Sequence, residues 1–256
     1  MGIVTEGEGA VARVVVDYPP VNALPVAGWS GLAETFRSLG RDDNIRAIVL
    51  SAEGRGFNAG VDIKEIQQQD NDLDRHKVLV NVNKGCAEAF AAVYECPVPV
   101  ISAVHGFCLG GGIGLVGNSD IILASEDAYF GLPEVDRGAL GAATHLARLV
   151  PQHKMRAMVY MAETATAQEL HAFGSVLEVL PPDQLRDRAV EIARSIEKKN
   201  PTVIRAAKGS LNGIDLWDVR RSYRFEQGFT FEVTLTGAGD EARQAFVGDA
   251  DTASDE

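Results

Sequence analysis

Three consecutive glycines, Gly110 to Gly112, carry the clearest chemical signal in this sequence. Without side chains they leave backbone N–H groups uncovered, so a ligand oxygen can come within hydrogen-bonding distance of the main chain. The apolar run at 97–104 predicts a buried strand before them, and residues 115–123 predict a helix and a returning strand after them. A helix that begins at the glycines would add its positive dipole end. The segment therefore predicts an anion-binding turn.

The same glycines have two other interpretations. Residues 112–117 spell G-x-G-x-x-G, which is typical of a dinucleotide-binding turn that follows a strand. Here the motif lies in the middle of the chain, not on a first strand, and other glycines separate it from the preceding strand. Glycines also permit close packing of a helix against its neighbours. We favour anion binding and keep both alternatives open.

Composition limits the class of protein. The chain has 256 residues, of which 46% are hydrophobic, and a formal net charge of −12. This predicts one large domain with an appendage. The negative charge argues against a nucleic-acid partner and against an anionic membrane surface, because both require a basic patch. No apolar run approaches the ~20 residues that cross a bilayer, so we expect a metabolic enzyme with no membrane partner.

Cys86, Cys96 and Cys108 are the three cysteines, an odd number without metal-ligand spacing. This cysteine pattern, together with the lack of a basic and apolar leader before the first strand, predicts a reducing cytoplasmic compartment. Cys108 lies beside the glycines, but no activating base neighbours it in the sequence. We expect Cys108 to be a small buried hydrophobe and not a nucleophile.

Strand and helix patterns alternate along the first half of the chain, which predicts a parallel sheet covered by helices. The polar stretch 67–76 predicts a mobile helix or lid. After Pro181 and Pro182 the pattern is almost wholly helical, until an acidic, solvated tail at 249–256. The expected elements, in chain order, are strand 10–17, helix 27–39, strand 46–51, helix 78–93, the glycine-bearing unit, helix 185–196 capped by Asp183, and a helix that starts at Pro201.

Four separated segments, 20–24, 56–65, 104–112 and 130–135, resemble in order and spacing the signatures of the crotonase superfamily of enoyl-CoA hydratases and isomerases. The resemblance covers nearly the whole chain. It implies an α/β fold, a crotonase-like spiral of ββα repeats with a helical C-terminal assembly region. On this basis residues 1–195 form the core with the CoA-binding and active site. Residues 196–256 form the trimerisation region with an acidic mobile tail, in a homotrimer or a dimer of trimers.

The resemblance also implies a ligand, an acyl-CoA thioester whose carbonyl oxygen is held by the backbone N–H groups of Val61 and Gly111. Such preorganised donors stabilise the charge of an enolate oxygen. Coenzyme A is then part of the substrate, and no further cofactor and no metal is implied. For Lys64 a solvated position on a helix is an equally good interpretation. The implied CoA-binding residues are Asn58, Ala59, Val61, Asp62, Ile63 and Lys64.

Family members that hydrate enoyl-CoA use two glutamates. At the first position this chain has Gly114, and at the second it has Glu134. Hydration needs paired acid and base groups, so the missing carboxylate argues against it, and we expect Gly114 to leave room for a fused ring. Glu134 is the expected acid, base or water-positioning group; a carboxylate that merely caps a turn is the alternative.

His145 and Asp136 are candidate catalytic residues that would assist Glu134. A neutral imidazole at His145, near the expected start of a helix, could accept a proton from water or orient a substrate oxygen. A hydrogen-bonded structural role is the alternative for His145 and is the expected role of His105. Asp136 either pairs with Arg137 or points into the pocket, and the sequence leaves both open.

Four longer segments, 54–65, 110–120, 131–145 and 223–232, resemble the actinobacterial branch of this family that opens the last steroid ring in cholesterol catabolism. That resemblance implies hydrolytic C–C cleavage of a cyclic β-diketone, an indane-dione carboxyl-CoA. Two alternatives remain open, a fatty-acid type enoyl-CoA hydratase/isomerase and a non-catalytic acyl-CoA-binding protein. Binding without turnover would distinguish the last of these.

Overall fold

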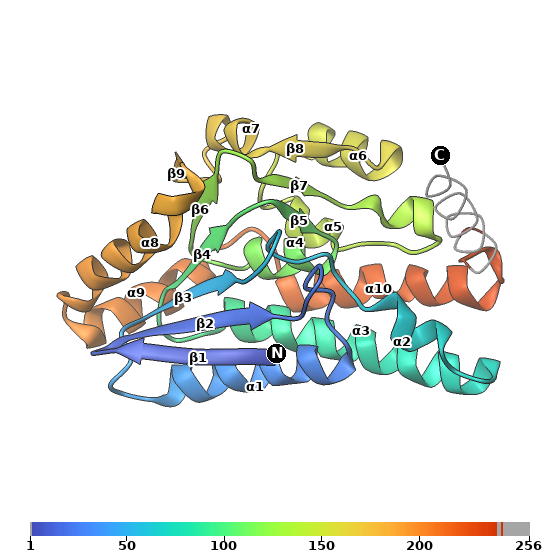
Figure 1. The fold of residues 1–256 in the computed structure, drawn as a ribbon, viewed down its shortest axis with the longest axis horizontal. Helices are drawn as coiled ribbons and strands as arrows, with labels where there is room; N and C mark the ends of the chain where they lie inside the picture. Colours follow the sequence, from blue (N-terminus) through green and yellow to red (C-terminus); the bar gives the residue numbers. More distant parts are fainter. Residues whose placement is uncertain (1, 240–241, 243–256) are drawn as a thin grey trace.

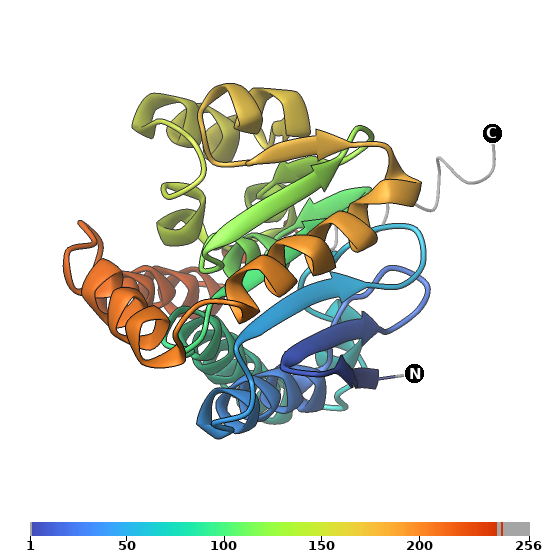
Figure 2. The same ribbon diagram turned by 90° about the vertical axis from the view of Figure 1, so that its left-hand side faces the viewer.

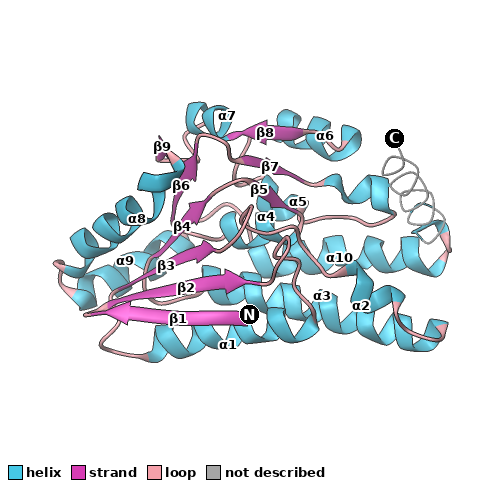
Figure 3. Cartoon of the chain, in the orientation of Figure 1, coloured by secondary structure: helices cyan, strands magenta, loops and turns pink. Residues whose placement is uncertain are grey.

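The computed structural model describes residues 2–239 and 242 and has an α/β fold (Figures 1 and 3). The acidic tail expected at 249–256 lies outside the described residues. The strands are β1 Gly2–Glu8, β2 Val11–Asp17, β3 Ala47–Ala52, β4 Val100–Val104, β5 Phe107–Leu109, β6 Ile121–Ser125, β7 Tyr129–Gly131, β8 Thr164–Thr166 and β9 Glu178–Leu180. The helices are α1 Val26–Arg41, α2 Ile63–Gln67, α3 Asp72–Tyr94, α4 Gly111–Val116, the 3₁₀ helix η1 Pro133–Arg137, α5 Ala143–Leu146, α6 Gln152–Met161, α7 Ala167–Ala172, α8 Pro182–Glu197, α9 Pro201–Gly213 and α10 Val219–Leu235.

The strands form two sheets. The larger has the strand order β1-β2-β3-β4-β6-β9, and its pairs are parallel except for the antiparallel β1–β2 pair at one edge. The smaller has the order β5-β7-β8, with β5 and β7 parallel. From β4 to β7 successive strands alternate between the sheets, since β4 is followed by β5 and then α4, and β6 by β7 and then η1. This repeat of strand, strand and helix is the predicted ββα spiral.

An earlier turn of the spiral is visible after β3. Asn58 forms a parallel bridge with Cys108 of β5, so the loop after β3 extends the small sheet by one residue. The amide of Leu109 donates to the carbonyl oxygen of Asn58 at 2.8 Å. The loop after β3 and the loop after β5 are therefore held side by side, and both run directly into helices.

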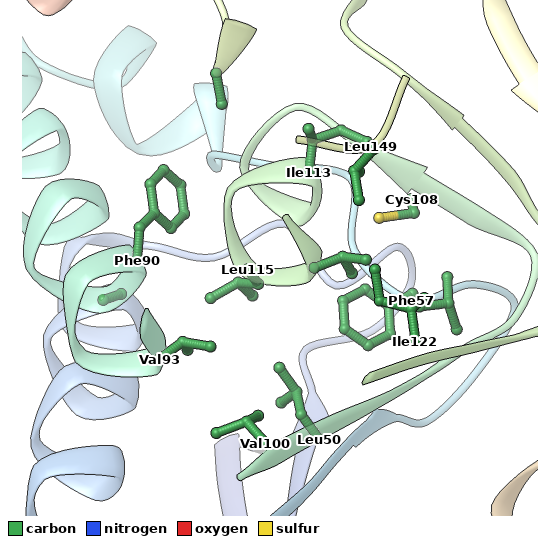
Figure 4. Packing of buried hydrophobic residues seen from close by; sticks show 14 of the residues in the cluster. Leu50, Phe57, Phe90, Val93, Val100, Cys108, Ile113, Leu115, Ile122 and Leu149 are labelled. Atoms are coloured by element: carbon green, nitrogen blue, oxygen red, sulfur yellow. The ribbon is translucent and has the colours of Figure 1, made fainter. Parts of the chain in front are cut away.

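Both faces of the large sheet are buried. Along β3, Ile48 and Leu50 face a core shared with α1, α3 and α4, whereas Ala47 and Val49 face a second core under α8. This alternation is the period of a strand with two covered faces. Figure 2 shows α8 lying across the sheet, and Figure 4 shows part of the larger core. On α8, the residues that fill the second core are Leu185, Ala189 and Ala193, spaced four apart.

Most elements expected from the sequence are present, with shifted ends. The helices that start at Val26 and Pro201 and the strands that start at Val11 and Ala47 match the predicted ranges within two residues. Strand β1 was not predicted, and the polar stretch 67–76, expected as a mobile helix or lid, is helical in its second half. From Asp72 onward it is the first turn of the long helix α3, which the side chain of Asn71 caps. Asp183 lies in the first turn of α8 and is not its cap.

Helix α10 returns to the core. Helix α10 packs against α3 and α5, and its residues Tyr223 and Thr230 are buried. This helix of the region expected at 196–256 therefore contributes buried residues to the core. None of the helices in residues 2–239 combines the length and the apolar character that a membrane span requires.

A buried ion pair holds α9 in place. The Lys208 ammonium is 4% exposed and lies 2.7 Å from both carboxylate oxygens of Asp120, whose Oδ2 also accepts the amide of Val100 at 2.8 Å. Replacing one partner leaves the other charge uncompensated, so we expect Lys208→Met to lower the free energy of unfolding by about 3 kcal/mol. Urea unfolding measures this. Lys198→Met, at an exposed position, is the matched control, and the added change Asp120→Asn should recover part of the loss.

Candidate active site

A pocket lies between the spiral core and the helices α3 and α10. Its lining is mostly apolar, with a few polar groups, which is the usual composition of a small-molecule site. Apolar residues come from α2 and α3, glycines from the two loops that precede α2 and α4, and polar residues from η1 and α10. The lining residues used below are Ala59, Val61, Ile63, Asn83, Phe90, Gly110, Gly111, Glu134, Arg137, Gly141, Tyr223 and Thr230.

Backbone N–H groups of Val61 and Gly111 border this pocket. Leu24 pairs with the extended backbone on both sides of Val61, because its amide donates to the Gly60 oxygen and its oxygen accepts from the Asp62 amide. The N–H of Val61 itself therefore points to the opposite side. Gly111 is the first residue of α4, and the first amides of a helix have no partner within it. The structure brings the two predicted oxyanion donors to one end of the pocket.

The two donor loops approach each other so closely that only glycine fits. Gly60 has a φ of +92°, and a Cβ there would lie 3.2 Å from the Gly111 nitrogen. A Cβ on Gly111 would lie 2.5 Å from the ring of Trp29, and Gly110 has a φ of +56°. The glycine run is thus required by space and backbone conformation together.

Glu134 faces the same end of the pocket. Its carboxylate lies between Gly110 and Gly141, where added Cβ atoms would come within 2.5 Å of Oε1 and 2.6 Å of Oε2. Oε2 is buried and has no hydrogen-bond partner in the described structure. Burial raises the pKa of Glu134 to about 7, with the charge of Glu226 adding to the effect and Arg137 opposing it. A carboxyl group with this pKa can take up or release a proton near neutrality.

His145 lies behind the pocket and not in its lining. Its ring is fully buried and packs at 5.0 Å from Phe90 and 4.9 Å from Tyr223, both of which do line the pocket. Asn118 Nδ2 lies 2.7 Å from the Gly114 oxygen and 3.0 Å from His145 Nδ1, so Nδ1 accepts and the ring is neutral. Burial lowers the pKa of His145 to about 3. The structure thus gives His145 a packing position next to α4.

Asp136 is not brought to the pocket. It is an exposed residue of η1 and is absent from the lining. Of the three predicted catalytic residues, only Glu134 lies in the pocket wall.

Gly114 does not leave the open space that we expected. A Cβ at Gly114 would lie 2.2 Å from Cζ of Phe90, so the ring of Phe90 fills the place of a side chain there. Figure 4 shows Phe90 projecting from α3 beside α4. The missing carboxylate is replaced by an aromatic wall. Phe90 also lines the pocket.

The predicted CoA-binding segment divides into two groups. Ala59, Val61 and Ile63 line the pocket, and Lys64 is exposed on α2. Asn58 and Asp62 shape the backbone instead. The buried Asn58 side chain donates to the Asn22 oxygen at 2.6 Å and accepts from the Gly60 amide at 2.8 Å, and Asp62 caps α2.

Sequence reasoning missed four residues near the site. Arg137 and Tyr223 line the pocket, and Phe90 fills the space at Gly114. Glu226 on α10 accepts hydrogen bonds from the amides of Ala143 and Thr144 at 2.7 and 3.0 Å, and so fixes the segment that follows Gly141. Arg137 had a local signal, its spacing of three from Glu134. The others come from helices distant in sequence, where no local pattern marks them.

A family model described as enoyl-CoA hydratase/isomerase matches residues 6–247. With its ββα spiral, the chain belongs to this family. It is 59% identical over 249 residues to the (7aS)-7a-methyl-1,5-dioxo-2,3,5,6,7,7a-hexahydro-1H-indene-carboxyl-CoA hydrolase of Rhodococcus jostii (strain RHA1), covering 96% of this chain and 95% of that protein. The Mycobacterium tuberculosis (strain ATCC 25618 / H37Rv) protein of the same name is 58% identical over 243 residues, 95% of this chain and 97% of that one.

A solved structure gives the same family. An enoyl-CoA hydratase/isomerase from Xanthobacter autotrophicus Py2 superposes with a TM-score of 0.85 at 25% identity, covering 96% of this chain and 91% of that one. Of the residues described, no group of three or more His, Cys, Asp or Glu side chains is arranged to hold a metal ion.

The arrangement as a whole suits acid–base chemistry on a thioester. Val61 and Gly111 both line the pocket, and backbone N–H groups of this kind are suited to an oxygen that becomes negative. A single carboxyl group with a pKa near 7 lies next to them. Such a site can move one proton at a time, and it has no second carboxyl group in the described lining.

The raised pKa of Glu134 has a consequence for stability. In the unfolded chain the carboxyl ionises near 4.5, whereas in the fold it ionises near 7, so the folded state loses stability as the pH rises from 4.5 through 7. At ~1.4 kcal/mol per pKa unit this is about 3 kcal/mol. We therefore compare the unfolding free energies of Glu134→Gln and the parent protein at each pH. From pH 4.5 to pH 8 this difference should shift in favour of the variant by about 3 kcal/mol. Denaturant unfolding at several pH values measures it, and a constant difference would contradict the raised pKa.

The contact between Gly114 and Phe90 gives a second expectation. Gly114→Ala forces a methyl group against the ring, and overpacking of this kind costs about 1–3 kcal/mol. Phe90→Leu in the same chain should relieve the clash, so the two substitutions together should cost less than the sum of each alone. A double-mutant cycle by thermal unfolding tests this, and simple additivity would show that the ring does not fill the space at Gly114.

Proposed function

We propose that this protein is a C–C hydrolase that opens a ring of a bicyclic indane-dione carboxyl-CoA in steroid degradation. The observation that carries the proposal is that Glu134, a carboxyl group with a raised pKa, lines the same pocket as Val61 and Gly111. Two relatives at 58% and 59% identity, aligned over almost the full length of both chains, are named as hydrolases of such a substrate.

The reaction has a balanced sequence at this site. Glu134 removes a proton from water, and the hydroxide oxygen bonds to the ring ketone. The C–C bond next to the ketone then breaks, and its electron pair moves through the conjugated system to the thioester oxygen, where Val61 and Gly111 hold the enolate. The proton on Glu134 returns to the ring carbon. The product is heavier by one water and carries a new carboxyl group.

The single carboxyl group favours this reaction over hydration of a straight-chain enoyl-CoA. Hydration places water and a proton on neighbouring carbons and uses two acid–base groups in this family, and the place of one is filled here by the Phe90 ring. In the proposed cleavage one group can act twice, because the proton taken from water is the proton that the enolate needs. A protein 30% identical to this chain, from Clostridium acetobutylicum, is named as a short-chain-enoyl-CoA hydratase, which keeps hydration as the alternative to test.

The proposal extends to the surroundings of the site. Ala59, Val61 and Ile63 contact the CoA group through their backbone, Lys64 faces its phosphates, and the substrate supplies the only coenzyme. Residues 196–256 mediate a homotrimer or a dimer of trimers in the cytoplasm. Exposed apolar side chains on and between α9 and α10 support an assembly role: Val203, Leu211, Ile214, Leu216, Trp217, Phe225, Phe229 and Leu235.

Incubation with the indane-dione carboxyl-CoA tests the reaction. We expect a product heavier by one water with a new carboxyl group, identified by mass spectrometry, and turnover that falls ~100- to 10,000-fold in Glu134→Gln with little change in thioester affinity. Crotonyl-CoA is the matched negative substrate. Hydration of crotonyl-CoA at ~10 per second or more would assign the protein to the hydratases, and thioester binding without any turnover would make it a binding protein.

A further inference from the structure

The pocket beside Glu134 holds one positive charge. Among the described residues that line it, Glu134 and Arg137 carry the charges, and Asn83, Tyr223 and Thr230 are neutral polar groups. The remaining lining is apolar or glycine. An anion that forms in the pocket away from the two backbone donors therefore has Arg137 as its cationic neighbour.

Arg137 is placed by the same short element as Glu134. Both belong to η1, three residues apart, and in a 3₁₀ helix the side chains at i and i+3 lie over one another. The two side chains therefore leave η1 on one face, toward the pocket that both line. The positive charge of Arg137 also works against the raised pKa of Glu134, as expected of a guanidinium close to that carboxyl group.

Ring hydrolysis creates negative charge at two places. One is the thioester oxygen, which faces Val61 and Gly111. The other is the former ketone oxygen, first as an alkoxide after hydroxide addition and then as one oxygen of a carboxylate. An ionised carboxylate in an apolar pocket is unfavourable unless it is paired and hydrogen-bonded. Arginine suits the pairing, since its planar guanidinium can donate two parallel hydrogen bonds to a carboxylate.

We propose that Arg137 is a catalytic residue that binds the alkoxide formed at the ring ketone and then the product carboxylate. The proposal rests on the ring hydrolysis proposed above and assigns its second anion site. In that sequence the water proton passes to Glu134 and on to the ring carbon, while the new carboxylic acid gives its own proton to solvent. Arg137 exchanges no proton and compensates charge throughout.

The test compares two ligands that differ in charge at one group. The synthetic ring-opened product and its methyl ester at the new carboxylate have nearly the same shape, and calorimetry measures their affinities for the full-length protein. We expect the parent protein to bind the acid more tightly than the ester, and Arg137→Gln to reduce that preference at least ~10-fold. Turnover in Arg137→Gln should fall ~100-fold or more, as for the loss of an oxyanion donor.

Two further variants isolate the role of the charge. Arg137→Lys keeps a cation without the guanidinium fork, so it should keep the preference for the acid while losing part of the turnover. Arg41→Met removes an exposed arginine at the end of α1 and should change neither quantity. Equal weakening of acid and ester in Arg137→Gln, or turnover within about threefold of the parent, would overturn the assignment. Absence of ring hydrolysis in the parent protein would instead refute the proposed function, whereas the affinity ratio would still report on Arg137.

Discussion

The close approach of two backbone loops at Gly60 and Gly110–Gly111 is the constraint on which the site depends. Strands β3 and β4 are parallel neighbours, so the loops that follow them leave the sheet at the same edge. The bridge between Asn58 and Cys108 then holds the loops in register. Any side chain at Gly60, Gly110 or Gly111 would push them apart or displace Glu134 or Trp29. The spiral fold thus brings the loop at Gly60 and the loop at Gly110–Gly111 close together.

The same crowding explains the properties of Glu134. Gly110 and Gly141 lie close on either side of its carboxylate, and Oε2 is buried without a hydrogen-bond partner in the described structure. The resulting loss of solvation raises the pKa of Glu134 to about 7, which costs stability at neutral pH and produces a group able to exchange protons there. The segment containing Gly141 is in turn fixed by the bonds of Glu226 to Ala143 and Thr144. Helix α10 therefore acts on Glu134 through its packing as well as through the charge of Glu226.

Local patterns in the sequence predicted the elements and the backbone parts of the site. The glycine run predicts that another part of the structure approaches the backbone closely. The β-branched strands and the amphipathic helix α8 are predicted by their periodicities. No local sequence pattern identifies Phe90 and Tyr223 as pocket residues, because they line the pocket only after α3 and α10 have packed beside the glycine turn. The error over Gly114 has the same origin. An absent side chain predicts empty space, but close packing fills such space with whatever neighbour can reach it, here Phe90.

Burial has opposite effects on the pKa values of His145 and Glu134. The position of His145 near the start of α5 allowed a structural or a catalytic role, and the structure places it behind Phe90 and Tyr223 with Nδ1 accepting from Asn118. Burial disfavours the charged form of a base and of an acid alike, so it lowers the pKa of His145 while it raises that of Glu134. The pKa of His145, about 3, therefore lies far from neutrality, whereas that of Glu134, about 7, lies near it. Of the two groups, only Glu134 combines access to the pocket with a proton that can move.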